Sequence, residues 1–427
     1  MKRFLSVLLC LFLLSQGCMT FAAGETTEAP VYTLPTVIPE DTPALPYCRF
    51  GILYEETTGT VLFAKQPERT NAPASMTKVM TALLVLEHNP TLEGSYVVPG
   101  VALTEKYCYW METGHLEGGE EVSIRELMNY LLIVSGNEAA TTLAHYVCGD
   151  IDAFIQKMND RAKELGMTKT HYADPHGLSE QNRLNSFDQL TLVREAMKHE
   201  LFREIVSTKS GQLPVSNKRS EPLRYSNTNR VMNPRNTLEY QSGFEEDIIG
   251  VKTGYIKVAG RNLSCCMDYD EEDLLFYSVV MNGRDVAVNG ETRQGHYLDT
   301  IDLMGWARTF HKEGVAAGDQ VATAATKGNK EDNIQLVAES EAMLLTQTEI
   351  QKTITLNEIG KEVKAGDVLG VVTMTDDFGN VKEVNLLAAS DAVTETNVTA
   401  IVLIAAAAVV AVAVVVVFAK KGKAAAK

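Results

Sequence analysis

An uncharged apolar run near the C-terminus, residues 401–419, constrains this chain more than any other feature. As an α-helix rising about 1.5 Å per residue, a run of this length just spans the hydrocarbon core of a membrane. Four lysines follow at once in residues 420–427, and such a basic flank predicts that the tail stays on the cytoplasmic side. We therefore expect a single C-terminal transmembrane helix with a basic cytoplasmic tail. The alternative is a buried core helix rich in Ala and Val.

The N-terminal end, residues 1–23, has the pattern of a secretory signal peptide. Lys2 and Arg3 precede the apolar stretch 4–14, which is short for a mature membrane span, and small residues follow near position 22. Cys18 offers a weaker alternative, a lipoprotein site. The two ends together predict a single-pass protein of the cell membrane with its body on the extracytoplasmic face.

The charge of the body between these ends is strongly negative. It holds 33 Lys and Arg against all 55 Asp and Glu of the chain, a net charge of −22. A nucleic-acid-binding protein would show a basic surface, so we exclude nucleic acid as a partner. Hydrophobic residues make up 45% of the chain, which is enough for a folded core.

The body divides into a linker and two folded units. Residues 24–46 hold five of the thirteen prolines and no Lys or Arg, which predicts a Pro-rich linker. Residues 47–312 alternate strand and helix patterns in the order expected of an α+β domain. The expected elements are a β-hairpin at 50–63, helices at 75–88, 123–147 (broken near 135–137), 151–165 and 300–312, and strands at 248–253, 261–266 and 274–281.

Residues 315–393 are expected to form a small all-β domain that acts as a spacer before the membrane. Its clearest strand patterns are 353–356, 368–375 and 381–387. Five cysteines remain after the signal peptide, an odd number that cannot all pair within one chain. Cys265 and Cys266 are adjacent in a predicted strand, so we expect them to face opposite sides of the sheet.

Three short motifs carry groups that could do chemistry. Ser75 and Lys78 lie three apart at the start of a predicted helix, so the amine can reach the hydroxyl and act as its base if burial lowers the lysine pKa. Ser135 and Asn137 lie at a predicted helix break, where a hydroxyl and an amide can face a cleft. Each motif alone is weak evidence of a catalytic function, since Ser and Lys at this spacing are common.

The third motif, Lys252-Thr253-Gly254, ends an apolar strand. The lysine and threonine can bind a substrate carboxylate, and the glycine allows a ligand backbone to approach the strand closely. The alternative without a functional role is a strand that ends in a turn.

In the order SxxK, SxN and KTG, the three motifs are those of penicillin-binding proteins and class A β-lactamases. The chain resembles the low-molecular-mass penicillin-binding proteins that act as serine-type D-alanyl-D-alanine carboxypeptidases. Six segments carry this resemblance: PASMTKVMTALL (73–84), LLIVSGNEAATTLA (131–144), MNDRAKELGM (158–167), YADPHGLSE (172–180), SNTNRVM (226–232) and GVKTGYIKVAGRNL (250–263).

The resemblance implies a β-lactamase-like or penicillin-binding-protein-like catalytic domain, an antiparallel sheet with helices, and a role for each motif. Ser75 would attack the carbonyl between two terminal D-alanines of a peptidoglycan stem peptide, with Lys78 as general base and Ser135 as proton relay. Asn137, Lys252, Thr253 and Gly254 would bind the substrate. The backbone N–H groups of Ser75 and Tyr255 would form the oxyanion hole. No metal or organic cofactor would be needed, and β-lactam antibiotics would be covalent inhibitors.

The sequence departs from the family pattern at a few positions. Glu138 follows the SxN motif where aspartate is more frequent, and Asp174 stands where asparagine is common. His296 aligns with an arginine that assists carboxylate binding in many members, and Arg293 lies close by, so the residue with this role is left open.

Three other functions are to be weighed. A class A β-lactamase would carry an ExxxN segment, but Glu164 is followed by Thr168 at the asparagine position. A D,D-endopeptidase that cuts peptide crosslinks would share all three motifs. A non-catalytic wall-binding protein would have no reason to retain every one of these catalytic side chains together.

Overall fold

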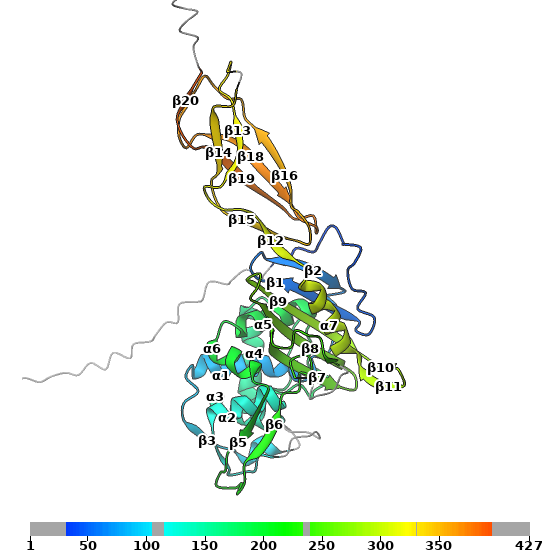
Figure 1. Ribbon diagram of the computed structural model, residues 1–427. Helices are drawn as coiled ribbons and strands as arrows, with labels where there is room; N and C mark the ends of the chain where they lie inside the picture. The colour runs from blue at the N-terminus through cyan, green and yellow to red at the C-terminus, as the bar shows by residue number, and fades with distance from the viewer. Residues whose placement is uncertain (1–30, 105–114, 234–239, 330, 395–427) are drawn as a thin grey trace, which may run out of the picture.

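The computed structural model describes residues 31–104, 115–233, 240–329 and 331–394, which form two units arranged end to end (Figure 1). The predicted signal peptide (1–23), membrane anchor (401–419) and basic tail (420–427) lie outside the described residues. Among the residues that are described, no helix has the length and apolar character that crossing a membrane requires.

The first unit is built on a five-stranded antiparallel sheet in the order β2-β1-β9-β8-β7. Its strands are β1 (Phe50–Glu55), β2 (Thr60–Lys65), β7 (Ile248–Ile256), β8 (Gly260–Tyr269) and β9 (Leu274–Gly283). Successive side chains of a strand point to opposite faces. Ile52 and Cys266 accordingly belong to one hydrophobic core, and Leu53 and Cys265 to a second. The predicted hairpin and the opposite orientations of the two cysteines are confirmed.

A sheet that is apolar on both faces needs a helical layer on each. On one side, α5 (Ser186–Ala196) contacts β1 and β9, and α1 (Lys78–His88) packs beside it. On the other side, α7 (Gly295–Ala307) contacts β8 and β9 (Figure 1). The remaining helices lie on the α1 side: α2 (Ile124–Asn129), α3 (Asn137–Cys148), α4 (Ile151–Glu164) and α6 (Glu200–Ser207).

The prediction of a helix over residues 300–312 is wrong at its C-terminal end. Helix α7 ends at Ala307, and His311–Val315 forms strand β12, which pairs antiparallel with β15 (Ala342–Thr346). The partner strand comes from a distant part of the chain, so the local pattern around residue 311 does not reveal it. The α+β class and the antiparallel sheet are confirmed.

Short elements complete the first unit. They are the 3₁₀ turns η1 (Ala74–Thr77) and η2 (Gly100–Leu103), the π turn η3 (Tyr130–Val134), and the strand pairs β3 (Ser95–Val97) with β4 (Glu121–Ser123), β5 (Ser210–Leu213) with β6 (Leu223–Ser226), and β10 (Asp285–Val288) with β11 (Glu291–Gln294). The predicted break at 135–137 is confirmed, because Ser135 and Gly136 separate η3 from α3.

The second unit is the small β domain expected from the sequence. A five-stranded antiparallel sheet runs in the order β13-β14-β19-β18-β16 and encloses its own apolar core. The strands are β13 (Gln320–Ala324), β14 (Ile334–Ala338), β16 (Gln351–Leu356), β18 (Val368–Thr375) and β19 (Val381–Ala388), with β17 (Glu362–Val363) and β20 (Ala392–Val393) paired at one end. The three predicted strands are confirmed.

Residues 31–46, the described part of the Pro-rich segment, pack against both units. The ring of Tyr32 stacks on Phe187 at 5.5 Å and meets Tyr54 edge-on. The backbone N–H groups of Thr36 and Val37 donate to the carbonyl of Phe378 in the β18–β19 turn, at 3.0 and 3.1 Å. This segment therefore bridges the two units across a span of the sequence longer than 300 residues.

Candidate active site

Ser75 lies in the 3₁₀ turn η1, directly before α1. Two glycines allow the neighbouring chain to approach this turn. A Cβ atom on Gly254 of β7 would lie 2.6 Å from the Pro73 carbonyl oxygen, and one on Gly177 would lie 1.9 Å from that of Ala74. Both contacts are impossible for any other residue. The glycine of the KTG motif therefore brings β7, the edge strand of the sheet, against the turn that holds Ser75.

Lys78, the first residue of α1, is fully buried and reaches back to the serine. Its Nζ lies 3.0 Å from Ser75 Oγ, 2.8 Å from Asn137 Oδ1 and 2.8 Å from the carbonyl oxygen of His176. These oxygens fix the amine beside the hydroxyl, which is the arrangement in which it can take the hydroxyl proton.

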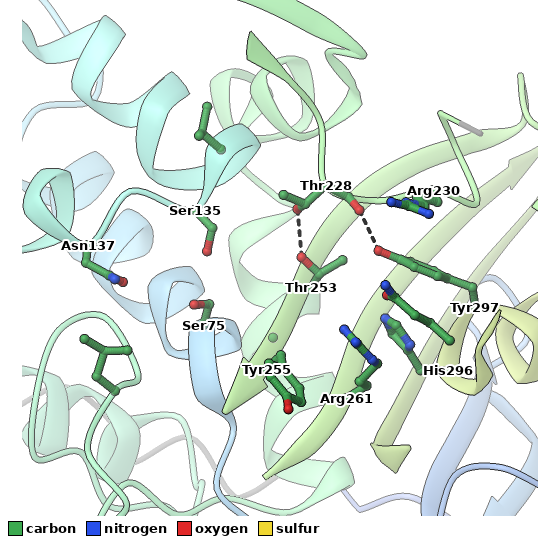
Figure 2. Close-up of a pocket in the computed structure, with 14 residues that line it drawn as sticks. Ser75, Ser135, Asn137, Thr228, Arg230, Thr253, Tyr255, Arg261, His296 and Tyr297 are labelled. Carbon is green, nitrogen blue, oxygen red and sulfur yellow. Dashed lines mark hydrogen bonds between the residues drawn. The ribbon is translucent and has the colours of Figure 1, made fainter. Parts of the chain in front are cut away.

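Ser135 and Asn137 face the same cleft from the start of α3. Ser135 ends η3 with φ = 75°, a left-handed conformation that turns its side chain towards Ser75 (Figure 2). Asn137 is the first residue of α3 and is 5% exposed. The predicted helix break is thus the means by which a hydroxyl and an amide reach one cavity.

Lys252 is buried within β7, close to Lys78. Burial, and after it the positive charge of Lys78, holds the pKa of Lys252 well below its usual value. Two ammonium groups close together repel each other, so the charge of Lys78 opposes protonation of Lys252.

Thr253 is part of a short chain of hydrogen bonds on the far wall of the cleft. Its Oγ1 lies 2.7 Å from Thr228 Oγ1, and the hydroxyl of Tyr297 donates to the Thr228 carbonyl at 2.6 Å (Figure 2). These contacts link β7, the segment after β6 and helix α7, and they hold the Thr253 hydroxyl towards the cleft.

The loop that follows α4 is organised by Asp174. Its carboxylate accepts backbone N–H groups of His176 (3.0 Å), Gly177 (2.5 Å) and Ser179 (2.5 Å). Burial opposes its charge, but His176 and these backbone donors outweigh burial and lower the pKa of Asp174. The loop in turn presents the His176 carbonyl to Lys78.

Together these elements enclose a cleft of about 420 Å³ (Figure 2). Six of the predicted residues line it: Ser75, Ser135, Asn137, Thr253, Gly254 and Tyr255. The other two, Lys78 and Lys252, are buried behind its wall. All eight predicted residues are therefore brought to one place.

The cleft also contains residues to which the sequence assigned no role. They are Val134, Leu178, Thr228, Arg230, Arg261, Gln294 and Tyr297. Thr228 and Arg230 lie within the SNTNRVM segment, and Arg261 lies within the segment that carries KTG, which is the only sequence signal for them. His296 lines the cleft, whereas Arg293 is not among its lining residues and lies 3.9 Å from Glu291.

A family model described as D-alanyl-D-alanine carboxypeptidase, peptidase family S11, matches residues 47–285. D-alanyl-D-alanine carboxypeptidase DacF of Bacillus subtilis is 28% identical over 320 residues, which cover 74% of this chain and 76% of that protein. A D-alanyl-D-alanine endopeptidase of Escherichia coli is 26% identical over 262 residues, 61% of this chain and 76% of the relative.

Among solved structures, the fold is similar to that of penicillin binding protein 5 from Haemophilus influenzae, with a TM-score of 0.57 and 22% identity. That alignment covers 83% of this chain and 99% of the other. It extends beyond the catalytic unit, so the β domain shares in the similarity of fold.

Proposed function

Because this chain belongs to the D-alanyl-D-alanine carboxypeptidase family and is a serine D-Ala-D-Ala carboxypeptidase, we propose that Ser75 is the nucleophile of its reaction. The observation that carries this proposal is the placement of the buried Lys78 amine 3.0 Å from Ser75 Oγ, within a cleft that Ser135, Asn137 and Thr253 also line. The proposed substrates are peptidoglycan stem peptides that end in D-Ala-D-Ala.

In the acylation step, Lys78 Nζ takes the proton of Ser75 as Oγ attacks the carbonyl of the penultimate D-alanine. The backbone N–H groups of Ser75 and Tyr255 stabilise the negative charge on the carbonyl oxygen. The C–N bond then breaks, and the leaving nitrogen receives a proton through Ser135, so that free D-alanine departs and an ester on Ser75 remains.

In the deacylation step, Lys78 takes a proton from water as the water oxygen attacks the ester carbonyl. The C–O bond to Ser75 breaks, and Oγ regains a proton from the lysine.

Substrate binding uses the same cleft. Asn137 holds the amide of the peptide, and Lys252 with Thr253 binds the terminal carboxylate. The hydrogen bond between Thr253 and Thr228 supports this role for the threonine, because it fixes the hydroxyl at the wall of the cleft.

Release of D-alanine tests the proposal. The full-length protein is incubated with a peptide ending in D-Ala-D-Ala, and free D-alanine is measured for wild type and Ser75→Ala. Wild type should release D-alanine, and the variant should lose at least about 10³-fold in rate, as expected when a covalent route is removed. A variant that retains the wild-type rate would overturn the assignment of Ser75.

Cleavage of peptide crosslinks is the second candidate activity, favoured by the similarity to the Escherichia coli endopeptidase. A crosslinked peptide dimer added to the same assay separates the two. Release of D-alanine from the single peptide with the dimer left intact supports the carboxypeptidase, and the reverse pattern supports the endopeptidase.

The ends of the chain complete the proposal. The apolar run 401–419 with its basic tail supports a membrane anchor, and residues 1–23 support export, so that the enzyme works on the outer face of the cell membrane. Protease added to intact cells without their wall should then digest the body and leave the tail protected. β-lactam antibiotics are proposed as covalent inhibitors at Ser75.

A further inference from the structure

Two adjoining hollows lie outside the catalytic cleft and share no lining residue with it. The larger, which we call the basic hollow, has a volume of about 580 Å³ and is formed by the start of β1, the segment after β2 and the loop after α4. Three of its side chains are exposed cations, Arg49, Arg69 and Lys169. Glu68 is the only carboxylate among its lining residues.

The three cations of the basic hollow form no ion pair within the part of the chain that the structure describes. By contrast, Arg161 of α4 and Arg194 of α5 are both paired with glutamates. Asp188 lies beside the loop, but its carboxylate accepts the backbone N–H of Lys169 and the hydroxyl of Thr170. Three cations against one anion give the basic hollow a net charge of +2, on a body whose net charge is −22. A concave basic surface on an acidic protein attracts a specific anionic partner.

The second hollow, which we call the aromatic hollow, has a volume of about 290 Å³ and adjoins the first, because Glu68 and Lys169 line both. Tyr32 and Phe187 line it as two nearly parallel rings with centres 5.5 Å apart. The hydroxyl of Tyr32 is held 3.0 Å from Thr191 Oγ1, which fixes the aromatic pair. An aromatic wall beside polar side chains suits a sugar ring, which has apolar C–H faces and a rim of hydroxyl groups.

The basic hollow lies within reach of the catalytic serine. Arg69 precedes Ser75 by six residues of one continuous segment, so their Cα atoms are at most about 22 Å apart. A stem peptide of about five extended residues spans about 17 Å. A peptide held at Ser75 by its C-terminal end can therefore start from a glycan strand that lies in the two hollows.

We propose that the basic and aromatic hollows together bind the glycan strand of peptidoglycan, at a site separate from the catalytic cleft. A sugar ring packs against the aromatic pair, and Arg49, Arg69 and Lys169 bind carboxylates that the strand carries. The choice of this polymer rests on the proposed function, whereas the binding itself needs no catalysis. The enzyme then stays on one strand while its cleft acts on the peptides of that strand.

The test measures binding of the full-length protein to glycan strands from which the stem peptides have been removed. Each lactyl group of such a strand ends in a free carboxylate, and no peptide is present to enter the cleft. A neutral chitin oligosaccharide of the same length offers similar sugar rings without the carboxylates, so wild type should bind it about tenfold or more weakly. Added salt should weaken binding of the acidic strand.

Arg49→Gln combined with Arg69→Gln should weaken binding of the acidic strand about 10- to 100-fold, as expected for loss of two charged hydrogen-bond donors, and leave binding of chitin within about threefold. Lys218→Gln combined with Arg224→Gln is the matched control, since it removes two exposed cations outside the cleft and both hollows. Its affinity for the acidic strand should stay within about threefold of wild type. Phe187→Leu keeps an apolar side chain but removes the ring, and it should weaken binding of both polymers about fivefold.

Thermal unfolding of each variant shows that the protein is folded, and release of D-alanine from a short free peptide should stay within about threefold of wild type in all of them. Unchanged binding of the acidic strand by the double arginine variant, or equal affinity of wild type for the strand and for chitin, would overturn the glycan site. Tighter binding of poly(glycerol phosphate) than of the strand would also overturn it, in favour of a phosphate polymer. Wild type that binds the strand as expected but releases no D-alanine would instead overturn the proposed function alone.

Discussion

At the scale of single residues, the cleft is distinguished by basic groups that are almost fully removed from water: Lys78, Lys252 and His296. Burial disfavours the charged form of a base, and each further cation nearby adds to that effect. The low pKa of Lys252 follows from both causes. Arginine cannot lose its proton in this way, so an exchange of protons around Ser75 requires lysines at these two positions.

The buried histidine gives the protein a defined sensitivity to acid. His296 has a pKa of about 3 in the native state against 6.5 in the unfolded chain. Between these values the unfolded state binds the extra proton, so this group makes the protein less stable as the pH falls below about 6.5, by roughly 1.4 kcal/mol per pH unit.

His296→Gln should remove this dependence. Unfolding free energies measured at pH 7 and pH 5 should differ by about 2 kcal/mol less in the variant than in wild type. Equal pH dependence of the two proteins would mean that His296 carries its proton in the native state.

The site residues that could be predicted from the sequence are those that belong to a recognisable motif. Ser75, Lys78, Ser135, Asn137 and Lys252 belong to motifs in which two groups stand at a fixed separation. Thr228, Arg230 and Tyr297 are single polar residues, and only the contacts of the segment after β6 with β7 and α7 bring them to the cleft. No local pattern carries that information.

At the scale of elements, the loop after α4 controls the turn that holds Ser75. Gly177 has φ = +96°, and a Cβ atom there would lie 1.9 Å from the Ala74 carbonyl oxygen. The same loop presents the His176 carbonyl to Lys78. Displacement of the loop therefore moves both the nucleophile and its base.

Gly177→Ala should lower stability by about 2 kcal/mol or more and slow acylation by a labelled penicillin at least tenfold. Gly94→Ala is the matched control, because Gly94 also has a positive φ, +87°, but has nothing within 4 Å of the new Cβ. The control should cost about 1 kcal/mol and leave acylation unchanged. Equal effects of the two substitutions would show that the close approach is unimportant.

Helices and strands whose apolar residues recur at a regular spacing could be predicted from the sequence. The residues at which these elements end were harder to predict. The strands 368–375 and 381–387 match β18 and β19, in which buried residues alternate with more exposed ones over most of β18 and the second half of β19. The helix expected at 300–312 ends at Ala307, since pairing with β15 draws residues 311–315 into a strand.

At the scale of the whole molecule, the two units are joined by a shared aromatic cluster. Phe378, in the β18–β19 turn of the β domain, is fully buried and stacks on Phe310 with ring centres 5.2 Å apart. It also meets the edge of Trp306 at 6.2 Å. Residues 31–46 lie against this junction. Their composition alone predicted a linker.

Phe378→Ala should remove about 3–5 kcal/mol from the contact between the units. Calorimetry should then show two unfolding transitions where wild type shows one, while penicillin acylation continues, because the cleft lies in the first unit. Val381→Ala, at a position of the same domain that is 56% exposed, should change neither result. A single unshifted transition in Phe378→Ala would show that the units are coupled elsewhere.

In the proposed mechanism, Ser75 forms the acyl-enzyme. The most direct measurement is mass spectrometry of the digested full-length protein after incubation with benzylpenicillin. We expect one added penicilloyl group, located on Ser75 and absent from Ser75→Ala. An adduct on Ser135, or an adduct that persists in Ser75→Ala, would contradict it.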